Sequence, residues 1–268
     1  MGLVRPQGAW CESIEMTKVR ADVLLVTRGL ADSRAKARAA IEAGGVRADG
    51  KRVEKPSEVL EAACDLSIVL AHPWVGRGAL KLAHALAIWR LPMAGATVLD
   101  IGASTGGFTQ VCLSQGAALV YAIDVGHGQL HADLAVDPRV VSLEGADARS
   151  LTLDIIPHAP DLIVCDASFI GLAKVLPAAL SLAGPGADLV ALVKPQFEVG
   201  PARVGKGGVV KDGAARAEAL DQVRAFLELS NWSVLAVDDS PITGADGNQE
   251  YLLHAQKKAA PCGAALSP

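Results

Sequence analysis

Short apolar runs alternate with longer amphipathic segments along most of the chain after residue 78. The runs are rich in valine, isoleucine and leucine and have the length of buried strands. The expected strands are 97–101, 119–123, 140–143, 162–165, 188–193, 234–237 and 251–255. Helical segments fill most of the gaps between them, so the pattern predicts a mainly parallel sheet that helices cover on both faces.

The pattern before residue 70 predicts a separate, small α+β unit. Its expected helices and strands are 21–29, 34–43, 46–47, 52–53 and 66–70. Glycines close both helices, and Asp32 and Ser33 can cap the second one. Asp49-Gly50 lies between two of the strands, and this dipeptide is a strong signal for a β-hairpin.

The change of pattern divides the chain into two domains with a short linker and two tails. The expected boundaries are 1–16 for the first tail, 17–70 for the small domain, 71–77 for the linker, 78–258 for the large domain and 259–268 for the second tail. The tails lack periodicity, and Pro73 disfavours a helix across the linker. Met16 stands directly before the first patterned segment and is an alternative start of the chain.

Composition narrows the class of protein. Hydrophobic residues make up 51% of the chain and charged residues 20%, which is enough to build a core and argues against global disorder. The formal net charge of −4 argues against a protein that coats nucleic acid through overall positive charge. The five cysteines include no Cys-x-x-Cys pair, so we expect reduced thiols. No run is apolar enough to span a bilayer or to act as a secretory signal, so we expect a cytoplasmic protein without a membrane partner.

Basic side chains are nevertheless concentrated in one short segment of the small domain, where only Asp22 and Asp32 oppose them. The six residues are Lys18, Arg20, Arg28, Arg34, Lys36 and Arg38. A solvated helix face is one interpretation of such a segment. In an acidic protein, this concentration favours contacts with the phosphates of RNA, and the six residues are the expected RNA-binding set.

A glycine-rich turn follows the first strand of the large domain. Residues 100–107 read Asp-Ile-Gly-Ala-Ser-Thr-Gly-Gly, and a helix is expected to begin directly after them. Glycines let a backbone approach a ligand closely, but the spacing differs from the G-x-G-x-x-G of dinucleotide-binding proteins. Asp124 ends the next strand, where it can bind both hydroxyls of a ribose, and Asp147 can bind an adenine amino group or cap a helix. Together they predict a site for an adenosine-containing ligand, although a plain strand-to-helix turn has the same local pattern.

Two further features have competing interpretations. His127 and His131 are four residues apart and can share a helix face, but no carboxylate has the spacing of a metalloprotease site. An exposed or substrate-facing pair is therefore favoured. The segment 205–212 resembles a phosphate-binding loop but lacks the Walker spacing, and a mobile lid near the substrate is favoured over a plain surface loop.

Five motifs stand in a fixed order along the chain: 77–82 (Arg-Gly-Ala-Leu-Lys-Leu), 100–109, 165–168 (Cys-Asp-Ala-Ser), 192–198 (Leu-Val-Lys-Pro-Gln-Phe-Glu) and 247–251 (Gly-Asn-Gln-Glu-Tyr). Together they resemble the TlyA family of 2′-O-ribose rRNA methyltransferases, whose catalytic domain is FtsJ-like. The small domain resembles the family's RNA-binding domain, named for small-subunit ribosomal protein S-four. The resemblance implies a Rossmann-like class I methyltransferase sheet with helices on both faces, preceded by a small α+β RNA-binding domain.

The resemblance also assigns roles to single residues. The lysine–aspartate–lysine–glutamate tetrad of FtsJ-like enzymes falls on Lys81, Asp166, Lys194 and Glu250. The implied contacts with S-adenosylmethionine are Asp100, Gly102, Ala103, Ser104, Thr105, Gly106, Gly107, Phe108, Asp124 and Asp147. No metal is implied. One departure is that Gly76 precedes the Arg-Gly pair where the family often has serine, which bears on the stiffness of the interdomain joint and not on the chemistry.

The tetrad suits a ribose hydroxyl, which needs a base to take its proton and cations to stabilise the alkoxide. Lys194 is the expected proton acceptor, as a neutral amine beside the Lys81 cation. Asp166 and Lys194 each follow a buried strand, which is where ligand sites form in open α/β sheets. The implied reaction is S-adenosylmethionine-dependent 2′-O-methylation of a cytidine in ribosomal RNA, within ribosomal subunits or ribosomes. The alternatives are a methyltransferase for a small molecule and an RNA-binding or membrane-active, haemolysin-like protein without enzymatic activity.

Overall fold

A computed structural model describes residues 18–70, 72–244 and 247–259. Nearly all of both expected tails, the alternative start at Met16 and Ala71 of the expected linker lie outside the described residues. The chain forms two compact units, Met1–Pro73 and Trp74–Pro268. Across the described ranges, no helix is long and apolar enough to cross a membrane.

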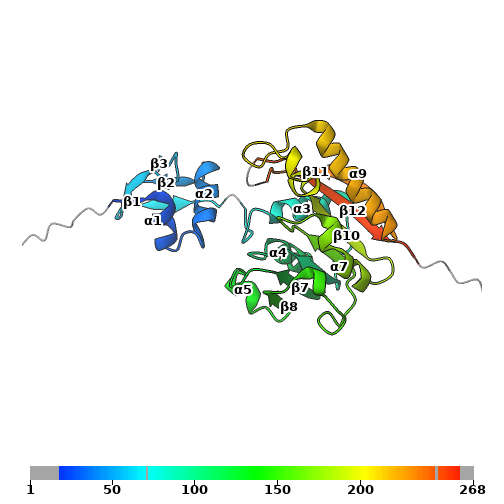
Figure 1. Ribbon diagram of the computed structural model, residues 1–268. Coiled ribbons are helices and arrows are strands. Elements are labelled where there is room, and N and C mark those ends of the chain that lie inside the picture. The colour runs from blue at the N-terminus through cyan, green and yellow to red at the C-terminus, as the bar shows by residue number, and fades with distance from the viewer. Residues whose placement is uncertain (1–17, 71, 245–246, 260–268) are drawn as a thin grey trace, which may run out of the picture. The chain divides into compact units, whose positions relative to one another are not determined.

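The described part of the first unit consists of short helices and small antiparallel sheets (Figure 1). Its elements are β1 (Lys18–Arg20), α1 (Ala21–Thr27), α2 (Arg34–Glu42), β2 (Val46–Ala48), β3 (Lys51–Arg52), β4 (Val59–Glu61) and β5 (Leu66–Ile68). Strands β2 and β3 form the expected antiparallel hairpin, and β5 pairs with the other edge of β2. Strands β1 and β4 pair with each other in a separate sheet. The backbone N–H of Lys36 donates to Ser33 Oγ at 3.3 Å, so Ser33 caps α2 as expected.

The sequence pattern missed β1 and β4. Lys18–Arg20 has two charged residues among its three, so it shows no apolar alternation. It is a strand because it pairs with Val59–Glu61, about forty residues further along the chain, and a local pattern does not contain that pairing.

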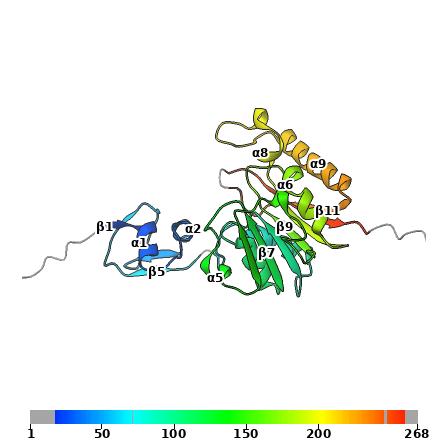
Figure 2. The same cartoon turned by 60° about the horizontal axis from the view of Figure 1, so that its bottom comes forward.

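The second unit is a seven-stranded sheet flanked by helices (Figures 1 and 2). Its strands are β6 (Thr97–Ile101), β7 (Leu119–Asp124), β8 (Val140–Glu144), β9 (Leu162–Cys165), β10 (Asp188–Val193), β11 (Trp232–Asp239) and β12 (Tyr251–Lys257). Its helices are α3 (Ala79–Trp89), α4 (Gly107–Ser114), α5 (Ala132–Ala135), η1 (Ala148–Ser150), α6 (Leu172–Val175), α7 (Pro177–Leu182), α8 (Pro195–Glu198), η2 (Pro201–Arg203) and α9 (Gly213–Leu229). The strand order is β11-β12-β10-β9-β6-β7-β8. Strand β12 is antiparallel to β11 and β10, and the other neighbouring pairs are parallel. The expected mainly parallel sheet is therefore confirmed.

Both faces of this sheet are buried, which explains why its strands are continuous apolar runs. Along β9, Leu162 and Val164 belong to the core beneath α3 and α4, whereas Ile163 and Cys165 belong to the core beneath α6, α7 and α9. Helices therefore cover both faces, as expected.

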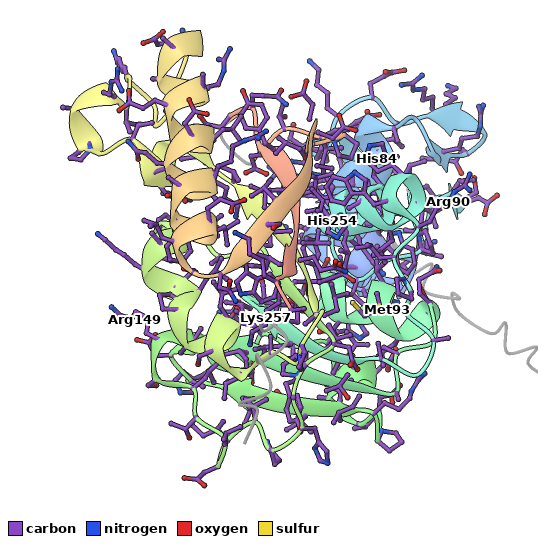
Figure 3. All side chains as sticks on the ribbon, turned by 90° about the vertical axis from the view of Figure 1, so that its right-hand side faces the viewer. His84, Arg90, Met93, Arg149, His254 and Lys257 are labelled. Atoms are coloured by element: carbon purple, nitrogen blue, oxygen red, sulfur yellow. The ribbon has the colours of Figure 1, made fainter. Side chains whose placement is uncertain are left out.

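Strand β12 is tied to helices on both sides of the sheet. The ring of His254 stacks on Trp89 of α3 with centroids 5.4 Å apart, and its Nε2 lies 2.8 Å from Asp188 Oδ1. On the opposite face, Lys257 Nζ donates to the carbonyl of Ala183 after α7 at 2.6 Å. Figure 3 labels His254 and Lys257 on this strand. These contacts hold β12 in a defined position relative to α3.

Candidate active site

The topology brings the ends of several strands to one edge of the large sheet. Parallel strands β9 and β10 end there, so Asp166 and Lys194, the residues that follow them, lie at the same edge. Strand β12 is antiparallel, and its first residue, Tyr251, pairs with Val193 at the end of β10. Glu250 therefore lies beside Lys194, although 56 positions separate them in the sequence.

The four tetrad residues form one ionic network. The Asp166 carboxylate lies between two ammonium groups, with Oδ1 2.6 Å from Lys194 Nζ and Oδ2 3.7 Å from Lys81 Nζ. Lys81 Nζ also donates to Glu250 Oε2 at 2.5 Å. Lys81, Lys194 and Glu250 are no more than 6% exposed. Each buried lysine nitrogen therefore faces at least one carboxylate, which satisfies the requirement that buried polar groups be paired.

Helix α3 delivers Lys81 to this network because a glycine stands just before it. A Cβ atom on Gly78 would lie 3.3 Å from Asp166 Oδ2, closer than most side-chain carbons approach such an atom. The absence of a side chain at Gly78 therefore lets the first turn of α3 pack against the carboxylate, with Lys81 one turn further along.

The network opens into a pocket of about 280 Å³, which we call the catalytic pocket. Its lining includes all four tetrad residues, and the other lining residues are Arg77, Gly78, Ser168, Phe169, Gln196, Phe197, Ile242, Thr243 and Gly244. Lys194 Nζ donates to Ser168 Oγ at 2.9 Å. Phe169 is 91% exposed with a left-handed backbone (φ 66°), and its ring lies 5.3 Å from that of Phe197. An exposed ring held in a strained conformation is typical of a functional site. No local pattern marked Phe169 as a site residue, and its position directly after the Cys-Asp-Ala-Ser motif was the available signal.

The glycine-rich turn requires glycine at two of its positions. Gly102 has φ 79° and Gly106 has φ 90°, in the left-handed region that other residues rarely adopt. A Cβ atom on Gly102 would also lie 3.0 Å from the backbone of Ala167, in the loop after β9. The turn is thus pressed against the loop that carries Asp166.

A second pocket, of about 490 Å³, lies beside this turn, and we call it the cofactor pocket. Gly102, Ser104, Asp124 and Asp147 line it, together with apolar residues such as Ile123. Ala103, Thr105, Gly107 and Phe108 line a smaller adjoining cavity of about 200 Å³. Asp100 and Gly106, which were also expected to contact the cofactor, line neither cavity.

Carboxylates shape the cofactor pocket in different ways. Asp124 accepts backbone hydrogen bonds from Ser104 and Gly126, both at 2.8 Å, and so links β7 to the glycine-rich turn. A carboxylate has about four lone-pair positions, which leaves two for the hydroxyls of a ribose. Asp147 caps η1 and forms an ion pair with Arg149, and the hydrogen bonds from the Arg149 side chain and backbone lower the pKa of Asp147 to about 2.

Asp100 is fully buried beneath the turn. Its Oδ2 accepts a hydrogen bond from Thr109 at 2.6 Å, while its Oδ1 has no hydrogen-bond partner among the described residues. Burial raises the pKa of Asp100 to about 7, and the nearby charges of Asp166 and Asp124 act in the same direction. Through its hydrogen bond with Thr109, this carboxyl group links β6 to α4, the two elements on either side of the turn.

The fit of the cofactor pocket to an adenosine derivative rests on its donor and acceptor set. It combines a carboxylate at the end of β7, a turn pressed close to its wall and an apolar surface. Asp166 lines the cofactor pocket, the smaller cavity and the catalytic pocket. A ligand in the cofactor pocket and a second molecule at the tetrad would therefore meet at Asp166.

Most of the six basic residues of the first unit have partners within it. Arg20 and Arg34 form ion pairs with buried Asp22 at 2.9 and 2.8 Å, and they lower the pKa of that carboxyl well below its usual range. Arg28 donates to the carbonyls of Ala62 and Cys64. Lys36 pairs with Asp32, and Lys18 pairs with Glu61. Arg38 is exposed, and in the part of the chain that the structure describes its side chain makes no such contact.

The two remaining features of the sequence take different forms. His127 and His131 do not share a helix face, because residues 125–130 form an irregular loop and His131 caps α5. Within the described segments, no three His, Cys, Asp or Glu side chains are grouped as a metal site.

The segment 205–212 is held at one end by the buried side chain of Asn248. The Asn248 amide accepts a hydrogen bond from Val210 N at 3.0 Å and donates one to the carbonyl of Gly208 at 2.8 Å. This end of the segment is anchored beside the strand that follows Glu250.

Both units of the chain are similar to known proteins. Residues 74–257 match the model of the FtsJ-like methyltransferase family, and residues 19–65 match that of the S4 domain. The 16S/23S rRNA (cytidine-2'-O)-methyltransferase TlyA of Mycobacterium tuberculosis is 48% identical over 88% of this chain and 89% of its own length. Hemolysin A of Brachyspira hyodysenteriae is 35% identical over 88% of this chain and 99% of its own. A solved structure from Streptococcus thermophilus has a TM-score of 0.73 at 40% identity, covering 92% of this chain and 90% of that one.

Proposed function

Because this chain belongs to the FtsJ-like methyltransferase family, we propose that it transfers the methyl group of S-adenosylmethionine to the 2′-hydroxyl of a cytidine in ribosomal RNA. One observation carries the proposal. The carboxylate of Asp166 lies between two buried lysines, and the same residue lines the cofactor pocket. The acceptor hydroxyl and the methyl donor can therefore be aligned at one point.

The tetrad has two tasks in this reaction. The 2′-hydroxyl must lose its proton as the new O–C bond forms, and the charge that develops on its oxygen must be stabilised. Two carboxylates stabilise the Lys81 cation, whereas Lys194 has one, so Lys194 is the better proton acceptor and Lys81 the better electrostatic partner. S-adenosylmethionine supplies a methyl group on a positively charged sulfur. We assign its binding to the glycine-rich turn, Asp124 and Asp147.

The S4 domain of the first unit supports an RNA substrate over a small molecule. The catalytic pocket is close to the lower end of volumes for small-ligand sites, so it suits a single nucleoside. The target nucleotide must then leave its stack to enter. We assign the substrate to ribosomal RNA within subunits or ribosomes, which places the enzyme in the cytoplasm.

The alternative of a haemolysin-like protein without enzymatic activity has less support. A relative named Hemolysin A is 35% identical to this chain. The paired tetrad and the adjoining cofactor pocket nevertheless form a complete arrangement for methyl transfer, which a binding protein would not require.

A transfer assay tests the proposal directly. Purified protein is incubated with S-adenosylmethionine labelled in its methyl group and with ribosomes, separated subunits or naked ribosomal RNA that lack the modification. We expect label in RNA and a 2′-O-methylcytidine when the product is digested and mapped. If none of the three substrates gains label while the protein still binds S-adenosylmethionine, the proposed function is wrong.

Arg38 offers the sharper test of RNA binding by the first unit. We expect Arg38→Glu to weaken binding of ribosomal RNA and to reduce the slope of log affinity against log salt by about one, because one phosphate contact is lost. The thermal stability should not change, since Arg38 has no partner to lose within the described residues. Titrations at several salt concentrations measure the slope.

Two variants act as controls for Arg38. Arg34→Glu places a second carboxylate beside buried Asp22, so it should lower the melting temperature and is unsuitable as a test of binding alone. Arg224→Glu makes the same charge change on an exposed site of α9 and should leave the slope intact. An unchanged slope for Arg38→Glu would mean that Arg38 belongs to a solvated helix face.

A further inference from the structure

Gln196 is a polar residue of the catalytic pocket that the tetrad chemistry does not use. It lies in α8, two positions after Lys194. Across the described residues, its Oε1 atom is buried and has no hydrogen-bond partner. A buried amide oxygen without a partner lowers stability, so such atoms are rare in native proteins and call for a specific explanation. A ligand in the catalytic pocket can supply the missing partner, because Gln196 lines that pocket.

Other polar side chains of the pocket are already engaged. Lys81 and Glu250 bind each other, and Ser168 accepts from Lys194. Arg77 donates to the carbonyl of Thr243 at 3.2 Å. The amide of Gln196 is thus better placed than these groups to form new hydrogen bonds with an incoming molecule.

The surroundings of Gln196 match the parts of one nucleoside. Lys194 precedes it by two residues and marks the place of the 2′-hydroxyl. Phe197 follows it, and with Phe169 it forms an aromatic pair that lines the same pocket and can pack against a base. Lys194, at the N-cap of α8, and the first turn of that helix therefore carry, in order, the proton acceptor, the amide and an aromatic ring.

We propose that Gln196 reads the polar edge of the target cytosine, with its amide oxygen accepting a hydrogen bond from the N4 amine. The inference rests on the proposed function, because it requires the target nucleoside to enter the catalytic pocket. Cytosine presents the N4 donor beside the N3 acceptor, and an amide presents an acceptor beside a donor, so the two can pair at both positions.

A double-mutant cycle, which removes the Gln196 amide and the cytosine N4 amine separately and together, tests this hydrogen bond. The protein variant is Gln196→Leu, which replaces the amide with an apolar side chain of similar volume. The RNA variant carries a pyrimidin-2-one ribonucleoside at the mapped target, which lacks only the N4 amine. For wild type and variant, kcat/KM is measured on both RNAs, and the affinity for S-adenosylmethionine is measured by calorimetry.

We expect loss of the N4 amine to lower kcat/KM by about tenfold, the factor for one lost hydrogen bond of typical strength. Gln196→Leu also removes the pairing at N3 and should lower kcat/KM by at least as much. The double change should cost little more than Gln196→Leu alone, because that variant has already lost the hydrogen bond to the N4 amine. The affinity for S-adenosylmethionine should stay within twofold. Gln222→Leu, on the exposed side of α9, is the matched control and should transfer to both RNAs as wild type does.

The outcomes distinguish failure of the Gln196 contact from failure of the proposed methyl transfer. If the two losses multiply, or if Gln196→Leu leaves transfer to the cytidine RNA unchanged, Gln196 does not bind the N4 amine. Gln196→Met provides a second variant if the leucine variant unfolds. If wild type transfers to neither RNA and to no ribosomal substrate, the proposed function itself fails.

Discussion

Replacing Lys194 with methionine should reduce methyl transfer by about a thousandfold or more while S-adenosylmethionine still binds. General-base catalysis contributes a factor of about 10² to 10⁴, and one group that stabilises a developing oxyanion about 10² to 10³. Lys194 is the expected proton acceptor, and its buried Nζ lies 2.6 Å from Asp166 Oδ1. Single-turnover transfer to the mapped target gives the rate, and calorimetry gives the affinity for the cofactor.

Two further variants separate the loss of a proton acceptor from the loss of a positive charge and from the removal of a lysine elsewhere. Lys194→Arg keeps the positive charge but cannot give up a proton in a protein, so it should be nearly as inactive as the methionine variant if Lys194 is the proton acceptor. Lys258→Met removes another ion-paired lysine, at the far end of β12 from Glu250, and should transfer normally. Transfer by Lys194→Met within tenfold of wild type would exclude Lys194 from the mechanism.

Asp100 should make the stability of the protein depend on pH. The folded protein keeps the Asp100 proton up to about pH 7, because burial raises the pKa of this carboxyl to about 7. The unfolded chain releases the proton near pH 4, the ordinary value for aspartate. Proton binding therefore stabilises the fold fully below pH 4, and this contribution is lost as the pH rises to about 7. At about 1.4 kcal/mol for each pH unit, the loss amounts to at most about 4 kcal/mol.

Asp100→Asn should remove this dependence, because an amide does not titrate. The free energy of unfolding of the variant minus that of wild type should rise with pH between about 4 and 7 and level off above. Denaturant titrations at several pH values measure the difference, which cancels the titration of groups that both proteins share. Asp154→Asn, at an exposed carboxylate, is the control and should show a constant difference. A constant difference for Asp100→Asn would mean that Asp100 is ionised in the folded protein throughout this range.

Much of the large domain was predictable from the sequence because its strands are buried on both faces. Such strands are unbroken apolar runs, and all seven were located, although β11 extends from Trp232 to Asp239, beyond the expected 234–237. The small strands β1 and β4 were missed because they are held by pairing across the first unit and have little apolar pattern. The order of five motifs was sufficient to recognise the family, and the family comparison bears this out.

The candidate site was predictable as a set of residues but not as an arrangement. Asp166 and Lys194 stood out because each follows a buried strand, and the resemblance added Lys81 and Glu250. Nothing local indicated that Asp166 lies between both lysines, or that Gln196 lines the same pocket with an unpaired oxygen. These contacts depend on the strand order β12-β10-β9-β6, which joins residues far apart in the chain.

The sequence by itself determined the kinds of element, the glycine-rich turn and the family, because backbone periodicity and local glycine requirements are written in neighbouring residues. The tertiary structure decided which charges are paired. It showed that Arg34 is held by Asp22 while Arg38 is exposed, and that Asp100 lies buried and lines neither the cofactor pocket nor the smaller cavity beside it. The reason is physical: whether a charged group is buried, paired or open to a ligand depends on what packs against it, and most of those partners come from distant parts of the chain.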